Sequence, residues 1–285
     1  MTPTDKRDRL RAILKGDVCK SPATVWDALS SRVAEAAGFE CGILSGAVCA
    51  ATVLGAPDHA LHTLSEFAAQ ARCITRACDL SVFADADQGY GNALNVMRTV
   101  EELEHAGLAG LSIEDLVMPA HFGRQGAAEL ISAREAVGKL KAAISARRDA
   151  SLVIAARTAA LRIEPIAQVV ERARAYASTG VDALFLTRLK RLEDLDAICA
   201  VVDIPIIVGR APEIPRAQLE ARGVRFRLQG HAVLPACAKA MYDTYMHLKA
   251  DGDPVELTPK LATPEEMARL MRVADYQRWN DTYLN

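Results

Sequence analysis

Short apolar runs alternate along this chain with longer segments in which apolar residues recur every three or four positions. Runs of the first kind are typical of buried strands, and segments of the second kind are typical of helices with one apolar face. Their regular alternation predicts repeated βα units around a parallel sheet. The eight strands expected on this basis cover residues 23–27, 40–46, 80–87, 109–115, 151–158, 181–187, 204–209 and 224–230.

Residues that begin and end helices stand between these runs. Asn92 is a good N-cap for a helix from Ala93 to about His105, in which apolar residues recur every three or four positions before Gly107. A glycine also stands just before other expected strands, where it suits the left-handed residue that ends a helix. These glycines are Gly38, Gly107, Gly180 and Gly223.

Eight strands with intervening helices in about 250 residues favour an α/β fold of the (β/α)8 TIM-barrel type over an open doubly wound sheet. No low-complexity linker divides the chain, so we expect one barrel domain over residues 1–285. The charged N-terminus predicts a surface helix rather than a signal peptide. A helical tail is expected from about 254 to 285, where Thr263-Pro264-Glu265-Glu266 is a good helix start.

Composition narrows the class of protein. Hydrophobic residues make up 51% of the chain and aromatic residues only 5%, which indicates a large aliphatic core. The formal net charge is -2 and basic residues are scattered, so neither nucleic acid nor a membrane is an expected partner. Seven cysteines, an odd number with no C-x-x-C pair, favour reduced thiols in a cytoplasmic protein.

In such a barrel the active site forms where the carboxyl ends of the strands meet. Polar residues fall at these positions in five of the expected units. They are Ser45 and Gly46, Asp85 and Asp87, Glu114 and Asp115, Arg157, and His231.

The acids among them suggest a metal site. Asp85 and Asp87 are two residues apart and share a strand face, and Glu114 projects from the neighbouring strand. Clustered carboxylates repel one another unless a cation lies among them, and Mg²⁺ or Mn²⁺ prefers such oxygen ligands. An isolated D-x-D is more often a solvated turn, so the metal interpretation depends on the convergence with Glu114. Gly89 and Gly91 lack the third glycine of a dinucleotide loop and are interpreted as a tight turn.

The remaining candidates have two interpretations each. Arg157 can form a structural ion pair with the acids, or it can receive a substrate carboxylate in bidentate fashion if a metal holds those acids. His231 can cap the last helix or face the substrate. His59 and His62 have no acid at a zinc-protease spacing, and we expect them to be surface or packing residues.

Five segments resemble the isocitrate lyase and phosphoenolpyruvate (PEP) mutase superfamily in order and spacing. They are "WDALSSRVAEAAGFECGILSG", "LGAPDHALHTLSEF", "FADADQGYGN", "SIEDLVMPAHFG" and "AARTAA", and the resemblance covers most of residues 22–250. It implies a (β/α)8 barrel whose last helix is swapped between subunits, a homotetramer built as a dimer of dimers, and Mg²⁺ that binds an α-keto acid or enolate.

The resemblance also implies roles for individual residues. Asp85 would be the direct metal ligand, and Asp58, Asp87 and Glu114 would hold metal-bound waters. Arg157 would bind oxygens of the small carboxylate substrate. The substrate carboxylate itself would be held by Ser45, Gly46 and the backbone of Ala47.

The loop after the fourth strand divides this superfamily. Its C–C lyases carry a catalytic cysteine where "PAHFGR" has Phe122, and the asparagine-containing loop of the P–C enzymes is absent too. "FECGIL", "GYGNALNVMRTV" and the "GHA" of His231 are most similar to bacterial oxaloacetate decarboxylases. The resemblance therefore implies a lyase that converts oxaloacetate to pyruvate and CO₂ through a metal-stabilised enolate, with His231 at the C4 carboxylate or the enolate. Departures from those decarboxylases occur at Ala47, at Ala159 and in "IVGRAPEI".

Two other functions stay open. One is cleavage of a 2-alkylmalate C–C bond or a P–C bond, which needs a different acid-base, for which His121 is the obvious candidate. The other is a non-catalytic oligomeric scaffold. Clustered acids at strand ends argue against a scaffold, which has no physical need for them.

Overall fold

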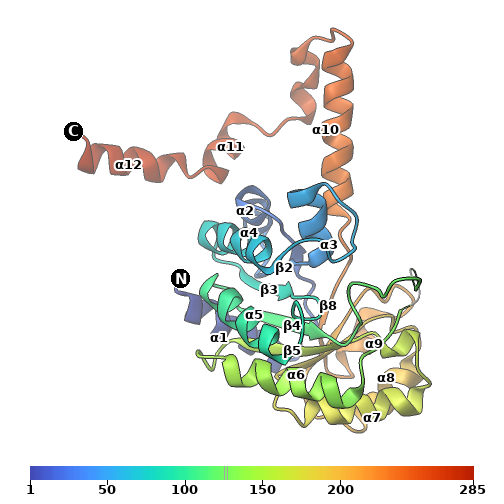
Figure 1. The fold of residues 1–285 in the computed structure, drawn as a ribbon. Helices are drawn as coiled ribbons and strands as arrows, with labels where there is room; N and C mark the ends of the chain where they lie inside the picture. The colour runs from blue at the N-terminus through green and yellow to red at the C-terminus, as the bar shows by residue number, and fades with distance from the viewer. Residues whose placement is uncertain (125, 127) are drawn as a thin grey trace. The chain divides into compact units, whose positions relative to one another are not determined.

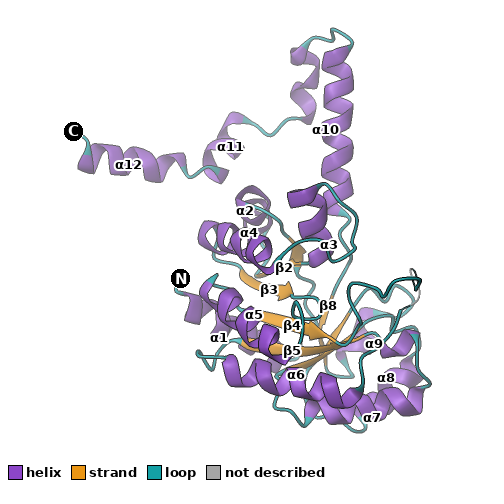
Figure 2. Cartoon of the chain, viewed as in Figure 1, coloured by secondary structure: helices purple, strands orange, loops and turns teal. Residues whose placement is uncertain are grey.

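A sheet of eight parallel strands in chain order forms the centre of the first part of the molecule (Figures 1 and 2). The structure, a computed structural model, describes residues 1–124, 126 and 128–285. Each strand lies within one of the runs expected from the hydrophobic pattern, so the strand prediction is confirmed. The strands are β1 (Ala23–Thr24), β2 (Cys41–Leu44), β3 (Ser81–Asp85), β4 (Gly110–Glu114), β5 (Val153–Thr158), β6 (Ala183–Leu186), β7 (Ile206–Val208) and β8 (Val224–Arg227).

The two ends of this sheet meet through the segment that leads into β1. The Lys20 N–H donates to the Arg225 carbonyl at 2.8 Å, and the Arg227 N–H donates to the Lys20 carbonyl at 2.9 Å. Lys20 thereby forms a parallel bridge with Phe226 of β8. The expected (β/α)8 TIM-type fold is confirmed.

Helices follow the strands and begin and end where the sequence signals place them. Asn92 caps α5 with its side-chain oxygen, which accepts from the Leu94 N–H at 2.9 Å. The glycines expected to end helices have left-handed φ angles, 85° at Gly107 and 90° at Gly180. The helices between strands are α2 (Ala28–Ala36), α3 (Gly46–Cys49), α4 (Leu64–Ala77), α5 (Ala93–His105), α6 (Ala133–Ala146), α7 (Ile166–Ala177), α8 (Leu192–Cys199) and α9 (Arg216–Glu220), with the short turns η1 (Ala50–Leu54) and η2 (Ala160–Arg162).

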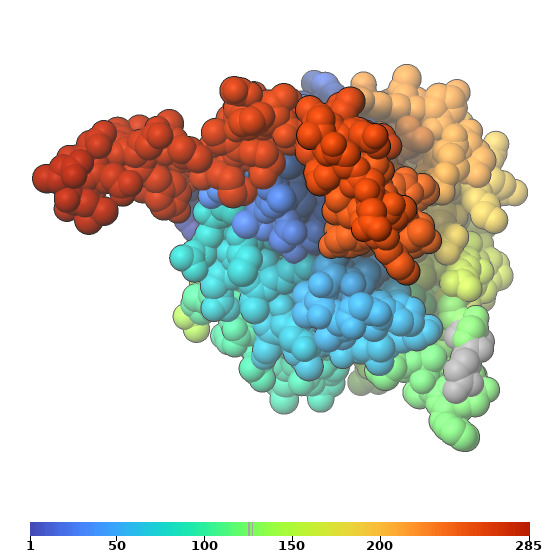
Figure 3. Space-filling view, turned by 90° about the horizontal axis from the view of Figure 1, so that it is seen from above, coloured from blue at the N-terminus to red at the C-terminus, as the bar shows by residue number. Residues whose placement is uncertain are grey.

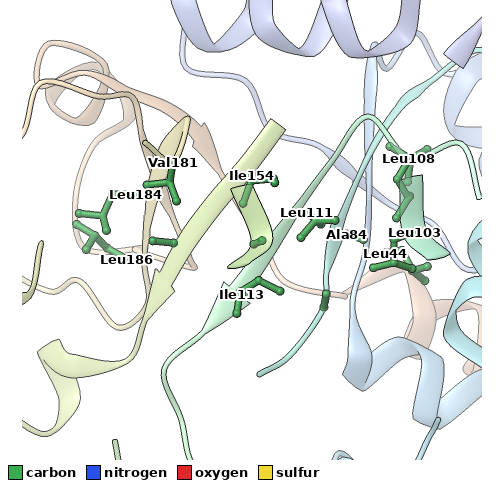
Figure 4. Packing of buried hydrophobic residues seen from close by; sticks show 14 of the residues in the cluster. Leu44, Ala84, Leu103, Leu108, Leu111, Ile113, Ile154, Val181, Leu184 and Leu186 are labelled. Carbon is green, nitrogen blue, oxygen red and sulfur yellow. The ribbon is translucent and has the colours of Figure 1, made fainter. Parts of the chain in front are cut away.

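Two hydrophobic clusters follow from the period-two alternation of the strands. The larger one joins alternate strand residues, such as Leu111 and Leu184, to the apolar faces of helices, as Leu103 of α5 illustrates (Figure 4). The smaller one holds the intervening strand residues, including Phe83 and Phe185, and lies inside the barrel. Because both faces of each strand are covered by apolar groups, a polar side chain inside the barrel needs a specific partner.

The N-terminal helix α1 (Pro3–Lys15) is more deeply packed than the predicted surface helix. Its Leu10 is fully buried and belongs to the cluster inside the barrel. The Arg7 Nε donates to the Leu108 carbonyl at 3.0 Å and the Arg11 Nε to the Ser151 carbonyl at 2.8 Å, both just before a strand. The helix therefore covers the N-terminal end of the barrel, opposite the end where the strands' polar residues lie.

The chain packs into two compact units, residues 1–230 and residues 231–285. The second unit contains the expected helix start at Thr263, whose side chain forms a capping box with Glu266. No helix of the described residues is both long enough and apolar enough to span a bilayer. The elements of this unit are α10 (Val233–Lys249), η3 (Pro254–Lys260), α11 (Pro264–Leu270) and α12 (Val273–Tyr283).

Candidate active site

Three of the predicted site residues extend the inward-facing series of their strands. Asp85 follows Phe83 by two positions in β3, and Arg157 ends the same alternation in β5. Glu114 closes β4 and lies directly beside Arg157 in the strand register. Since all three stand at carboxyl ends of neighbouring strands, the fold brings them together at one end of the barrel.

Arg157 lies between two of the acids. Its Nη1 donates to Asp85 Oδ2, and its Nε is 3.3 Å from Glu114 Oε1. The guanidinium also lies 5.3 Å from the centre of the Phe185 ring, in cation–π range. The structural ion pair that the sequence allowed is therefore present, and it fixes the plane of the guanidinium.

Asp87 lies beyond the end of β3 in a strained backbone conformation. Its φ of 46° is left-handed, and its carbonyl accepts from the Glu114 N–H at 2.7 Å. A Cβ at Gly46 would lie only 2.6 Å from Asp87 Oδ1, so the glycine makes room for the carboxylate. Oδ2 of this buried aspartate has no hydrogen-bond partner among the described residues. Such an unsatisfied buried oxygen points to a missing positive or hydrogen-bonding group.

Ser45, Gly46 and Ala47 form the turn from β2 into α3. The Ser45 hydroxyl accepts from the Val48 N–H at 3.3 Å and caps this short helix. Gly46 contacts Asp87 as described, so this turn borders the acids. Their expected role in holding a substrate carboxylate stays a prediction.

Asp58 comes from the exposed surface segment that follows η1, part of the light-blue region in Figure 3. Its own carboxylate is exposed, but its charge reaches the acids inside the barrel. It contributes to the raised pKa values of Asp87 and Glu114. All four predicted acids, Asp58, Asp85, Asp87 and Glu114, thus interact electrostatically.

Burial dominates the protonation of the inner acids. It raises the pKa of Asp87, and the nearby Asp85 raises it further. Burial also raises the pKa of Glu114, against the opposing effect of Arg157. Loss of hydration would lower the pKa of Arg157, but Asp85 and Glu114 outweigh it and raise that pKa. The cluster holds more negative charge than one arginine compensates, which favours a further cation.

The donor set fits a hard divalent cation. Carboxylate oxygens are the ligands that Mg²⁺ and Mn²⁺ prefer, and Asp87 Oδ2 is buried without a partner. In the described residues no group of three or more His, Cys, Asp or Glu side chains is already arranged as a complete metal site. Arg157 instead provides the positive charge beside Asp85.

His62 lies beside the acids, a position that the sequence reasoning did not predict. It was expected to be a surface or packing residue, and it does pack, with its ring centre 5.5 Å from that of Phe67. Its Nε2 also lies 3.5 Å from Asp87 Oδ2 and 3.0 Å from Tyr90 Oη. Burial lowers the pKa of His62, which favours the neutral ring. The only available signal was its position four residues after Asp58, since the contact with Asp87 is long-range.

Asp115, the other acid at the end of β4, serves the framework. It accepts from Thr158 Oγ1 at 2.6 Å, from Tyr176 Oη at 2.8 Å and from the Ala159 N–H at 3.2 Å. These bonds tie β4 to the end of β5 and to α7. They hold the segment that follows Arg157 in place.

Three exposed basic residues line a hollow formed by the segments that follow β5 and β6. A hollow of about 300 Å³ follows β5 and β6, and is lined by Leu161, Arg162, Arg188 and Lys190. The basic residues among them, Arg162, Arg188 and Lys190, form no ion pair with another described residue. Exposed basic residues of this kind favour the approach of an anion.

His231 is the first residue of the second unit and stands two positions before α10. Its predicted contact with substrate stays a prediction.

A closed parallel barrel with buried acids and an arginine at the carboxyl ends of its strands defines a (β/α)8-barrel enzyme. The family can be stated as well. The family model described as Phosphoenolpyruvate phosphomutase matches residues 10–249, and the chain belongs to that family.

Individual relatives agree with this membership. An oxaloacetate decarboxylase of Bradyrhizobium diazoefficiens is 48% identical over 272 residues, which cover 95% of this chain and 94% of the relative. The solved phosphoenolpyruvate phosphomutase of Streptomyces platensis subsp. rosaceus has a TM-score of 0.89 and 28% identity, covering 98% of this chain and 99% of the other. A phosphonopyruvate hydrolase solved in complex with oxalate and Mg++ has a TM-score of 0.87 and 26% identity over 100% of both chains.

Proposed function

We propose that this protein is a Mg²⁺-dependent oxaloacetate decarboxylase, a lyase that forms pyruvate and CO₂. The observation that carries the proposal is the position of Arg157 between Asp85 and Glu114 at the barrel mouth. The Arg157 guanidinium can bind the anionic oxygens of a small keto acid, and the neighbouring acids suit a divalent cation. The high identity to a relative named oxaloacetate decarboxylase, over nearly the whole of both chains, supports this choice of substrate.

Asp85, Asp87, Glu114 and Asp58 would hold the metal, with Asp85 as the direct ligand and the others through water. A bound Mg²⁺ or Mn²⁺ would supply positive charge beside the ketone of the substrate, which makes that ketone a better acceptor for the electrons of the bond that breaks when CO₂ leaves. A structurally similar phosphonopyruvate hydrolase was solved in complex with oxalate and Mg++, which supports the choice of Mg²⁺ as the ion.

The protein's own groups complete the site. The Ser45–Ala47 turn would receive the C1 carboxylate of oxaloacetate. The Arg157 guanidinium, held by Glu114 and by the Phe185 ring, would bind the oxygen that becomes negative as CO₂ leaves. Because the Arg157 and Asp85 side chains are only 18% and 12% exposed, the interaction between them is stronger than it would be in open solvent.

The loop after β4 has no cysteine that could act as the acid-base of a C–C lyase. Phe122 stands where related C–C lyases carry a catalytic cysteine, and its side chain is fully exposed. Decarboxylation needs no such group, because the electrons of the broken bond move into the ketone and a proton is added afterwards. This is the reason for preferring decarboxylation over cleavage of an alkylmalate.

The decisive experiment is an assay of purified protein with Mg²⁺ or Mn²⁺ and a panel of substrates. We expect pyruvate from oxaloacetate well above the rate with metal alone, and no turnover of phosphonopyruvate or 2-alkylmalates. The metal-only control matters because free divalent ions also decarboxylate oxaloacetate. Turnover of an alkylmalate but not of oxaloacetate would favour a C–C lyase that uses His121. No turnover of any substrate would favour the scaffold.

His231 is proposed to bind the C4 carboxylate or the enolate. His231→Ala should then lower kcat/KM for oxaloacetate by about 10-fold to 100-fold, as expected for loss of a charge-assisted hydrogen bond. Steady-state kinetics of the variant measure this directly. Unchanged turnover would exclude the role.

We also propose that the protein works in the cytoplasm as a homotetramer, a dimer of dimers with a swapped C-terminal helix. The seven cysteines, all within the described residues, form no disulfide, which suits a reducing compartment. The single-domain organisation, with a C-terminal helical tail, belongs to the same proposal.

A further inference from the structure

His62, Asp87 and Tyr90 form a contact between two loops that the catalytic proposal does not use. His62 Nε2 faces both Asp87 Oδ2, at 3.5 Å, and Tyr90 Oη, at 3.0 Å. The imidazole side chain has no exposed surface, and its ring meets that of Tyr90 edge-on with centres 5.8 Å apart. The three groups therefore have little freedom to separate.

The hydrogen on the ring can be placed from this geometry. His62 Nδ1 is buried and has no hydrogen-bond partner among the described residues. A hydrogen there would be a buried donor without an acceptor, which is costly. On Nε2 the hydrogen faces the phenol oxygen and the free carboxylate oxygen of Asp87. The structure thus favours the Nε2–H form of the ring.

The backbone supports an exact placement of these side chains. Asp87 and Tyr90 both have left-handed φ angles, 46° and 59°, although neither is a glycine. Residues held in such conformations are costly and persist where surrounding contacts fix them. At Gly89 a Cβ would lie 2.5 Å from a methyl carbon of Val96, so the turn is packed tightly against α5.

The contact joins the two loops that supply outer acids. His62 stands four residues after Asp58, on the segment between η1 and α4, while Asp87 and Tyr90 belong to the turn after β3. Asp87 Oδ2 has no other partner among the described residues, so His62 is the polar group that can fix its orientation.

We propose that His62, supported by Tyr90, is a positioning residue that orients Asp87 and holds the Asp58 segment against it for cation binding. His62 itself is not a ligand in this proposal. It rests on the proposed metal site, but it does not depend on the identity of the substrate.

The test measures Mn²⁺ binding to the full-length protein by electron paramagnetic resonance, without substrate. His62→Leu should raise the dissociation constant of Mn²⁺ by about 10-fold to 100-fold, the usual effect of removing a partner of a metal ligand. His62→Gln, whose amide N–H can replace Nε2, should restore part of the affinity. Tyr90→Phe, which keeps the ring and removes only the hydroxyl, should have a smaller effect. His59→Leu, on the same segment but exposed, is the matched control and should bind as wild type does.

Thermal melting of the metal-free variants tests whether they fold. If His62→Leu unfolds, Tyr90→Phe and His62→Gln still decide the matter through their Mn²⁺ affinity. Wild-type affinity in the folded variants would overturn the positioning role and leave the metal site intact. Absence of Mn²⁺ binding by the wild type would overturn the metal site and this role together. A failure to decarboxylate oxaloacetate would overturn only the proposed function.

In the oxaloacetate assay, the dependence of kcat on Mn²⁺ concentration distinguishes a loss of metal affinity from a loss of catalysis. A positioning residue acts through metal occupancy, so saturating Mn²⁺ should recover most of kcat in His62→Leu. A kcat that stays low at saturating metal would contradict the proposal.

Discussion

Arg157 is the last inward-facing residue of β5, and its guanidinium has three neighbours, Asp85, Glu114 and the Phe185 ring. Lysine carries the same charge but has no planar fork, so it cannot donate to Asp85 and also present a second nitrogen to Glu114 as the guanidinium does. Arg157→Lys should therefore lower kcat/KM for oxaloacetate by about 100-fold or more, the typical effect of losing a charge-stabilising donor. Steady-state kinetics at saturating Mg²⁺ provide the measurement.

The control for that substitution is Arg162→Lys, which changes an exposed arginine five residues further along the chain. It should keep most of the wild-type activity, since its charge is conserved and it contacts none of the acids. An Arg157→Lys enzyme as active as Arg162→Lys would show that charge alone is required at position 157.

At the residue scale, the site residues that stand at the ends of strands could be predicted from the sequence. Asp85, Glu114 and Arg157 follow from alternation along a strand and from the rule that strands end at the active site. The Arg157–Asp85 bond and the contact of His62 with Asp87 join residues 72 and 25 positions apart in the chain. Local sequence patterns give no information on pairs so far apart, so these contacts could be identified only from the structure.

The same distinction holds for whole elements. The strands and α5 are predictable because hydrophobic period and caps are local signals. Helix α1 was misjudged as a surface helix because its many charges conceal an apolar stripe. Its arginines donate to carbonyls just before strands, and Leu10 fills the space that Gly110 leaves, where a Cβ would lie 2.9 Å from it. Long charged side chains can thus cover a barrel end.

Asp149 attaches α1 to the barrel and should make its stability depend on pH. Its Oδ2 accepts from Arg7 Nη1 at 2.6 Å and from Thr4 Oγ1 at 3.0 Å. Partial burial opposes ionisation, but hydrogen bonds from Ser151 and Arg7 outweigh it and lower the pKa of Asp149 well below its usual value. The stabilisation is therefore present above the unfolded-state pKa of about 3.9 and is lost as the pH falls below it.

Asp149→Asn should then cost about 1 kcal/mol of unfolding free energy at pH 7, since the carboxylate is partly exposed. The difference from wild type should shrink below about pH 4, where the carboxylate takes up a proton in the unfolded chain while it still keeps its charge in the folded protein. Urea denaturation at pH 7 and pH 3 measures both values. Asp8→Asn, an exposed change on the same helix, should show neither effect. An equal difference at both pH values would contradict the assignment.

At the scale of the whole molecule, the exposed apolar residues of α10 are consistent with the proposed homotetramer. Helix α10 has 17 residues and none of them is buried. Met241 and Tyr245, four residues apart and therefore on one face, are 54% and 68% exposed. Most helical stability comes from packing an apolar face, and large exposed apolar surfaces usually mark interfaces. A second copy of the chain is the partner that the swapped-helix tetramer would provide.

Charges on that face should therefore break the assembly. Met241→Glu combined with Tyr245→Glu is expected to reduce the mass measured by light scattering from four chains to fewer, because burying two carboxylates in an apolar interface is unfavourable. Leu94→Glu, a 74% exposed change on α5 of the first unit, is the matched control and should remain tetrameric. A wild-type protein that is monomeric at micromolar concentration would show that α10 needs no partner chain. A tetramer that survives both glutamates would place the interface elsewhere.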